Sequence, residues 1–214
     1  MKITKIGHCC LVIEENGVKI LTDPGAFTKA QNDLTGIDVL MITHEHEDHF
    51  HVDSVAAILK NNPDILVVTN SAVGKLLDAK GIKYQVLEEG QEADIKGVHV
   101  SGHGTKHAEI WKEQGQVMNT GYMIANKLFM PGDALTNPGK PVDILALPTA
   151  GPWLNYPQVI NYAKDVKPRV AFPVHDEILA QYAGFFNGWL GQLLQGEGVK
   201  LVMAENGKEI QGLE

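Results

Sequence analysis

The sequence has few cysteines, and the two that it has are adjacent. Cys9 and Cys10 are the only cysteines among 214 residues. A disulfide between neighbouring residues is strained, so no disulfide framework is expected. The spacing also supplies no partner ligands for a metal. We therefore expect both to be small buried residues in a reducing compartment.

Positive charge and long apolar runs are scarce as well. Lys and Arg number 18 against 26 Asp and Glu, which gives a net charge of -8. A nucleic-acid-binding protein usually carries a basic patch, so no nucleic-acid partner is expected. No run reaches the roughly 18 apolar residues of a membrane span, and residues 1–7 lack the apolar segment of a signal peptide. The sequence thus predicts no membrane partner and a cytoplasmic location.

The composition that remains is that of an ordinary globular protein. Hydrophobic residues make up 44% and charged residues 21% of the chain. A chain of this length can bury a full core as one unit. No repeat or linker divides it, so a single domain over residues 1–214 is predicted.

One stretch, residues 39–50, dominates the sequence. It reads Val-Leu-Met-Ile-Thr-His-Glu-His-Glu-Asp-His-Phe. The apolar run 39–42 predicts a buried strand, and His44, His46, Asp48 and His49 follow within six residues of Thr43. Imidazole and carboxylate groups bind divalent metals, and side chains two apart in extended backbone point the same way. A solvated turn is the alternative, but a cluster at a strand end favours a metal site.

The predicted elements change character along the chain. Strands are expected at 2–6, 9–14, 18–22, 39–42, 65–69 and 82–87, with helices at 55–59 and 71–80. All-β segments follow at 92–96, 98–101, 117–125, 127–130 and 143–147. A helix to 166, a strand at 169–174, a helix at 178–194 and weak strands at 200–204 and 208–211 complete the list. The first helix should begin at Asp53 or Ser54 and the second at Asn70 or Ser71.

This order decides between two architectures. A single doubly wound parallel sheet needs alternating strands and helices throughout, and residues 92–130 do not alternate. Two mixed β-sheets packed face to face with helices outside satisfy the order. The predicted fold class is therefore α/β (α+β), a four-layer αββα sandwich.

Other metal-type residues also stand at predicted strand ends. Asp133 follows 127–130, and His175 follows 169–174. Asp23 ends the strand at 18–22, where it either caps its own turn or orients a ligand histidine. After the strand at 98–101, both His103 and His107 could reach a metal. The glycines that flank His103 would allow close backbone approach, which favours His103.

These motifs together resemble the metallo-β-lactamase superfamily. The pattern His-x-His-x-Asp-His at 44–49 is similar to its signature. The segments His107-Ala-Glu-Ile, Asn119-Thr-Gly-Tyr, Pro131-Gly-Asp-Ala-Leu and Pro173-Val-His-Asp resemble uncharacterised members of that superfamily. The resemblance implies the metallo-β-lactamase fold. It also favours His107 over His103 as the third histidine ligand.

The resemblance implies a binuclear metal centre. One ion would take His44, His46 and His107, the second would take Asp48, His49 and His175, and Asp133 would bridge them. Two Zn²⁺ ions are expected, with Fe, Mn or Ni as alternatives. Ions about 3.5–4 Å apart can share a water and lower its pKa to about 7, which supplies hydroxide at neutral pH. Asp48 is predicted to orient that hydroxide and to carry its proton away.

The activity predicted on this basis is metal-dependent hydrolysis of a small-molecule ester, lactone, thioester or phosphodiester bond. His8 and Trp153 are candidate substrate contacts; a hydrogen-bonded core histidine is an equal alternative for His8, and aromatic residues that follow a strand, such as Trp153, more often serve packing. A nuclease or phosphodiesterase of the same fold, or an iron-dependent oxidoreductase, is the alternative. A homo-oligomer is compatible with the sequence.

Overall fold

The fold is built on two seven-stranded sheets. The computed structural model describes residues 1–214. The first sheet has the order β14-β1-β2-β3-β4-β5-β6. Its strands are β14 (Lys208–Glu209), β1 (Lys2–Gly7), β2 (Cys10–Glu15), β3 (Val18–Thr22), β4 (Val39–Ile42), β5 (Leu66–Thr69) and β6 (Gln85–Val86).

The second sheet has the order β13-β12-β11-β10-β9-β8-β7. Its strands are β13 (Lys200–Leu201), β12 (Val170–Val174), β11 (Ile144–Pro148), β10 (Leu128–Met130), β9 (Gly121–Ile124), β8 (Val98–His103) and β7 (Glu92–Ile95). Both sheets are mixed, because hairpins at one end give way to parallel pairs at the other. The predicted mixed sheets are thus confirmed.

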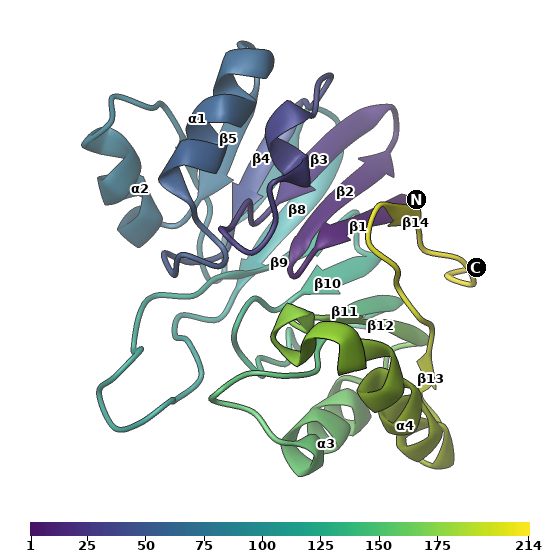
Figure 1. The fold of residues 1–214 in the computed structure, drawn as a ribbon. Coiled ribbons are helices and arrows are strands. Elements are labelled where there is room, and N and C mark those ends of the chain that lie inside the picture. Colours follow the sequence, from purple (N-terminus) through teal and green to yellow (C-terminus); the bar gives the residue numbers. More distant parts are fainter.

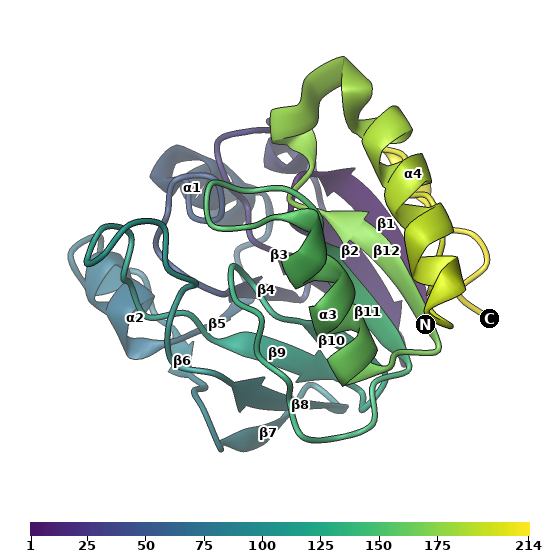
Figure 2. The same ribbon diagram turned by 90° about the horizontal axis from the view of Figure 1, so that it is seen from below.

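Helices cover the two outer faces of this sandwich. Leu40 and Ile42 face α1 (Val52–Asn61) and α2 (Ser71–Asp78). Leu145 and Leu147 face α3 (Tyr156–Val166) and α4 (Ala183–Gly196). Figures 1 and 2 show the two helix pairs on opposite sides of the molecule, which gives the four-layer αββα arrangement. No helix has both the length and the apolar character that a membrane span requires.

The main core lies between the sheets, and strand periodicity builds it. Successive side chains of a strand point to opposite faces. In β4, Val39 and Met41 therefore join Val100, Tyr122 and other residues of the facing sheet, while the alternate residues of β4 contact α1 and α2. All four residues of β4 are buried, as the continuous apolar run predicted.

Turn residues set the hairpins. Asn16 and Gly17 both have positive φ, at 51° and 80°, as the type I′ turn between β2 and β3 requires. Ala125 and Asn126 do the same between β9 and β10, with φ of 54° and 52°. Tight hairpins therefore join β2 to β3 and β9 to β10.

Several predicted boundaries were wrong. The helix predicted at 178–194 is interrupted at Ala180, whose φ of 49° and ψ of -132° are not helical, so a 3₁₀ segment η2 (Glu177–Tyr182) precedes α4. A second 3₁₀ segment, η1 (Ala30–Asp33), was not predicted. The strand predicted at 117–125 is confined to β9. Helix α1 begins after His51 rather than at Asp53 or Ser54, whereas Asn70 caps α2 as expected.

Candidate metal centre

The histidines and aspartates singled out in the sequence meet at one edge of the sandwich. His8 follows β1, and the His44–His49 segment follows β4. His107, Asp133 and His175 come after β8, β10 and β12 of the other sheet. Because the strands that end here belong to two packed sheets, side chains more than 100 residues apart become neighbours. Two overlapping ligand groups result.

The first group contains His44, His46, His107 and Asp133. One possible ligand atom from each lies within 4.8 Å of the others. The imidazole of His46 lies 4.9 Å from that of His44 and 4.6 Å from that of His107, measured between ring centroids. These are the three histidines expected at the first ion.

His103 does not join this group. Its Nε2 lies 2.9 Å from the hydroxyl oxygen of Ser101, and its ring packs edge-on against Phe129. His103 is the last residue of β8, whereas His107 lies beyond the strand and belongs to the cluster. The flanking glycines favoured His103, but the geometry favours His107.

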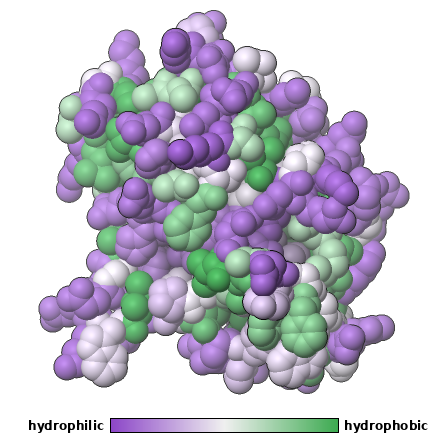
Figure 3. Space-filling view, viewed as in Figure 1, coloured by the Kyte–Doolittle hydropathy of each residue, from purple (hydrophilic) through white to green (hydrophobic).

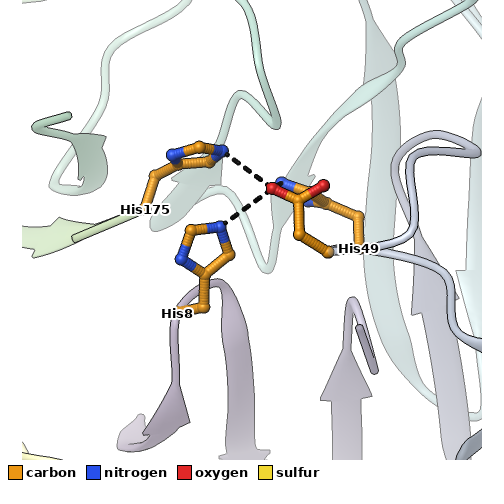
Figure 4. A group of neighbouring side chains, drawn as sticks. His8, His49 and His175 are labelled. Atoms are coloured by element: carbon orange, nitrogen blue, oxygen red, sulfur yellow. Dashed lines mark hydrogen bonds and ion pairs between the residues drawn. The ribbon is translucent and has the colours of Figure 1, made fainter. Parts of the chain in front are cut away.

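The second group contains His8, Asp48, His49 and His175, again within 4.8 Å. Asp48 Oδ2 lies 3.1 Å from Nε2 of His8 and 3.3 Å from Nε2 of His175. Figure 4 shows the rings of His8 and His175 on two sides of this carboxylate, with His49 beside them. His8, a candidate substrate contact, is buried and lies among the candidate ligands.

Asp133 lies between the two groups. Its Oδ1 is 3.0 Å from Nε2 of His49, and its Oδ2 is 2.9 Å from Nε2 of His175 and 3.2 Å from Nε2 of His107. A carboxylate in contact with histidines of both groups has the position that a bridging ligand needs. The indole of Trp153 donates a hydrogen bond of 3.1 Å to the same Oδ2.

Hydrogen bonds orient three of the histidines. His49 Nδ1 lies 2.9 Å from Asp23 Oδ2, and His107 Nδ1 donates to the carbonyl of Ala108 at 2.5 Å. His44 Nδ1 lies 3.0 Å from the Thr43 hydroxyl, which itself donates to Asp23. With Nδ1 engaged in this way, each ring turns Nε2 toward the cluster, as metal-ligating histidines do. Of the two roles proposed for Asp23, the geometry supports the orientation of a ligand histidine.

Burial and charge tune the protonation of these groups. Burial lowers the pKa of His44 and of His46, and neighbouring histidines add to this effect. Burial opposes the ionised form of Asp133, but His49 and His175 outweigh it and hold its pKa well below the usual range. Burial likewise favours neutral His175, yet Asp133 outweighs it and raises that pKa to about 10. Neutral imidazoles and ionised carboxylates are the forms that bind metal, so metal binding would displace the proton of His175.

Several of these atoms are buried without a hydrogen-bond partner. They are Nε2 of His44, His49 and His175, and Oδ1 of Asp133; the His49 and His175 nitrogens lie close enough to Asp133 for ion pairs but do not form hydrogen bonds with it. Buried polar atoms are almost always satisfied, so a cluster of exceptions calls for an absent partner. Divalent cations fit, because nitrogen and carboxylate donors from several directions suit Zn²⁺ and related ions. The donor set therefore fits metal ions.

Two glycines allow the loops to approach this closely. A Cβ on Gly25 would lie 1.7 Å from the carbonyl oxygen of Asp48. Only glycine therefore allows the Asp23–Gly25 turn to pack this closely against the His44–His49 segment. A Cβ on Gly132, which has a φ of +64°, would lie 2.3 Å from Asn119 Oδ1. That oxygen accepts the backbone N–H of Asp133 at 3.0 Å. Asn119 thus positions Asp133.

The family comparison agrees with this geometry. A family model described as the beta-lactamase superfamily domain matches residues 2–175, which is most of the chain. The chain belongs to the beta-lactamase superfamily. The match spans every residue of both candidate ligand groups, from His8 to His175.

Curated relatives within this superfamily cover nearly the whole chain. Protein Rv0786c of Mycobacterium tuberculosis is 32% identical over 90% of this chain and 92% of its own length. A UPF0173 metal-dependent hydrolase of Carboxydothermus hydrogenoformans is 26% identical over 82% of this chain and 84% of its own.

Solved structures share the superfamily fold. Igni18, a metallo hydrolase of Ignicoccus hospitalis, has a TM-score of 0.76 at 20% identity and covers 97% of this chain and 96% of its own. An isothiocyanate hydrolase from Delia radicum gut bacteria has a TM-score of 0.73 at 18% identity, with 99% of each chain covered. At these identities the likeness concerns the fold alone, and it confirms the predicted metallo-β-lactamase fold.

One candidate ligand of this superfamily member was missed. Cys9 was set aside for want of partners, yet its sulfur lies within 4.8 Å of ligand atoms of His49 and Asp133. Burial raises the pKa of the Cys9 thiol, so it is neutral in this setting. No local signal could have placed it there, because both neighbours come from other strands. Cys10 is also buried, but it belongs to the apolar cluster that includes Val55 and Ile58 of α1.

Proposed function

We propose that this protein is a binuclear metal-dependent hydrolase that cleaves a small-molecule ester, lactone, thioester or phosphodiester bond. The observation that carries the proposal is the pair of ligand groups joined at Asp133. His44, His46 and His107 would hold one ion, and Asp48, His49 and His175 would hold the other. When bound, the two ions, for which zinc is the first candidate, would supply Lewis acidity and a shared water with a pKa of about 7.

The side chains of the protein supply the proton path. Asp48 and His46 are the partly exposed candidate ligands: the side chain of Asp48 keeps 19% of its accessible surface, whereas those of His49 and Asp133 keep 3% or less. Burial opposes its charge, but hydrogen bonds from His175 and His8 outweigh this and lower its pKa far below the ordinary value. Asp48 is therefore an ionised acceptor at neutral pH. His8 Nε2, 3.1 Å from Oδ2, donates to this carboxylate and holds it in position to accept a proton.

The other residues near the centre act by position. Trp153 is buried and holds Asp133 through its indole N–H, so it supports the bridge more directly than it could contact a substrate. Water is excluded from the inner half of the site, since His44, His49 and His175 are all buried. This low-dielectric floor would strengthen interactions with the negative charge that develops on a substrate oxygen.

Exchange of one carboxylate tests the proposal. Asp48→Asn keeps the size of the side chain and one oxygen donor but removes its charge. The variant should retain the ion held by His44, His46 and His107, while kcat falls by about 10² or more, the usual scale of a lost acid–base group. Activity would be measured on a panel of lactones, thioesters, aryl esters and phosphodiesters, with metal content measured on the same preparations.

Glu47→Gln provides the matched control. Glu47 is the adjacent acidic residue, its side chain is exposed, and it belongs to neither ligand group. The control should keep wild-type activity and metal content. An Asp48→Asn protein with both ions and near-normal kcat would contradict the role given to Asp48. Absence of hydrolysis across the panel by metal-loaded wild type would contradict the function itself.

A further inference from the structure

An apolar groove lies beside the metal centre. It is lined by ten residues, none of them charged, and encloses about 430 Å³. A volume of that size suits a small organic ligand. Its apolar lining includes Leu154, Tyr156, Ile178, Leu179, Phe186 and Trp189.

The groove lies next to the metal ligands. One wall begins at Thr149, whose backbone N–H donates to the carbonyl of Val174, the residue before His175. The other wall begins at Ile178, three residues after His175. At the floor, a Cβ on Gly151 would lie 2.9 Å from the indole nitrogen of Trp153, which in turn bonds to Asp133. The indole of Trp153 therefore lies against a residue of the groove and also bonds to the Asp133 carboxylate.

The walls of the groove are fixed by contacts between elements. The hydroxyl of Tyr156, at the start of α3, donates to the carbonyl of Phe186 in α4 at 2.9 Å. The rings of Tyr156 and Trp189 pack 5.6 Å apart. Because α3 and α4 are tied in this way, the groove exists before any ligand arrives, and little ordering would accompany binding.

The groove is also part of an exposed apolar surface. Ile178 is 46% exposed and Trp189 is 50% exposed, and apolar side chains gather over η2 and α4 in Figure 3. Large exposed apolar side chains that line a hollow mark a binding site more often than chance exposure. The lining offers no Lys or Arg to balance an anion and no carboxylate to balance a cation. A charged ligand group would be desolvated there without a partner.

We propose that this groove binds the uncharged apolar portion, alkyl or aryl, of the substrate, and so selects a neutral hydrophobic ester, lactone or thioester over a phosphodiester. This inference rests on the proposed hydrolase function for its catalytic meaning. The binding itself depends only on the groove. Reaction occurs at the metal centre, and the apolar portion lies along η2 and α4.

Binding is tested on the metal-loaded protein with a neutral fluorescent probe, N-phenyl-1-naphthylamine, displaced by 1-alkanols from pentanol to nonanol. Each added methylene should tighten displacement by about two- to fourfold, as expected for partial to full burial of a CH₂ group. Octyl phosphate should compete at least tenfold more weakly than octanol. The same displacement midpoint for all chain lengths, or equal competition by octyl phosphate, would overturn the proposal.

A pair of matched variants locates the binding site. Trp189 lines the groove, whereas Phe185 is 71% exposed on the same helix and does not. Trp189→Asp should weaken nonanol binding tenfold or more, and Phe185→Asp should change it less than twofold. Ile178→Asp, on the opposite wall, repeats the test without a change in α4. Equal losses in Trp189→Asp and Phe185→Asp would show nonspecific binding to the apolar surface and refute the assignment.

A kinetic arm separates this inference from the proposed function. Aryl esters with acyl chains of two to eight carbons should show kcat/KM rising with chain length in wild type and in Phe185→Asp, but not in Trp189→Asp. Hydrolysis without chain-length dependence would support the proposed hydrolase function and contradict the proposed role of the groove. Alkanol binding that depends on Trp189, without any hydrolysis, would support the groove as a binding site and contradict the proposed hydrolase function.

Discussion

Removal of one buried charge should test how the site is anchored. Lys5 in β1 is 1% exposed, and its ammonium forms an ion pair with Asp176, the residue that follows His175. The ammonium also donates to the carbonyl of Pro173 at 3.2 Å, and Asn187 of α4 donates to the second oxygen of Asp176 at 2.9 Å. This network fixes the segment that carries His175, whose φ is 59°.

Lys5→Met keeps the aliphatic stem but leaves the Asp176 carboxylate buried without its cation. Breaking a buried pair in this way costs about 3–5 kcal/mol, a large part of the roughly 5–15 kcal/mol that stabilises a typical domain. Lys5→Met/Asp176→Asn removes the unpaired charge and keeps an acceptor for Asn187. The double variant should therefore recover about 2 kcal/mol or more of the loss.

Urea unfolding of metal-free protein, followed by circular dichroism, measures both effects without interference from metal loss. Lys2→Met is the control, because Lys2 is exposed on the same strand, and it should change the free energy of unfolding by less than about 0.5 kcal/mol. A Lys5→Met protein within about 1 kcal/mol of wild type would refute the reasoning. So would a double variant no more stable than the single one.

Two further predictions concern the metal centre. His107→Ala should lose metal and activity while His103→Ala keeps its metal, as measured by elemental analysis; the reverse result would show that the Gly-flanked histidine is the ligand. Purified protein should hold close to two transition-metal ions per chain, and chelation should lower its melting temperature, because a ligand present at 100 times its Kd stabilises the folded state by about 2.7 kcal/mol. A stable, metal-free protein that takes up no zinc would contradict that stoichiometry.

Local sequence was enough to locate the strand ends and the chemistry they carry. The apolar run before Thr43 and the change of pattern after residue 92 predicted two mixed sheets, and both are present. The turn at Asn16-Gly17 and the cap at Asn70 were readable because they depend on residues next to one another. Helix boundaries were read less well. The segment Glu177–Tyr182, which contains the break at Ala180, has no Pro or Gly that would predict a break.

The choice between His103 and His107 required more than local pattern. Glycines beside His103 favoured that residue, and only the family resemblance favoured His107, the histidine that lies in the candidate ligand group. The structure gives the physical reason: His103 ends β8 and packs against Ser101 and Phe129, whereas the chain must leave the strand before it can turn a histidine toward His46.

Residue types and the ends of strands were determined by the sequence itself, because hydrophobic periodicity and turn chemistry act over a few residues. Which strand ends lie side by side was decided by tertiary structure alone. The face-to-face packing of two sheets brings Cys9 and His8 to the ligands of distant strands and sets Trp153 against Asp133. The same packing places η2 and α4 around the apolar groove. Such contacts join residues far apart in the chain, so no local pattern encodes them.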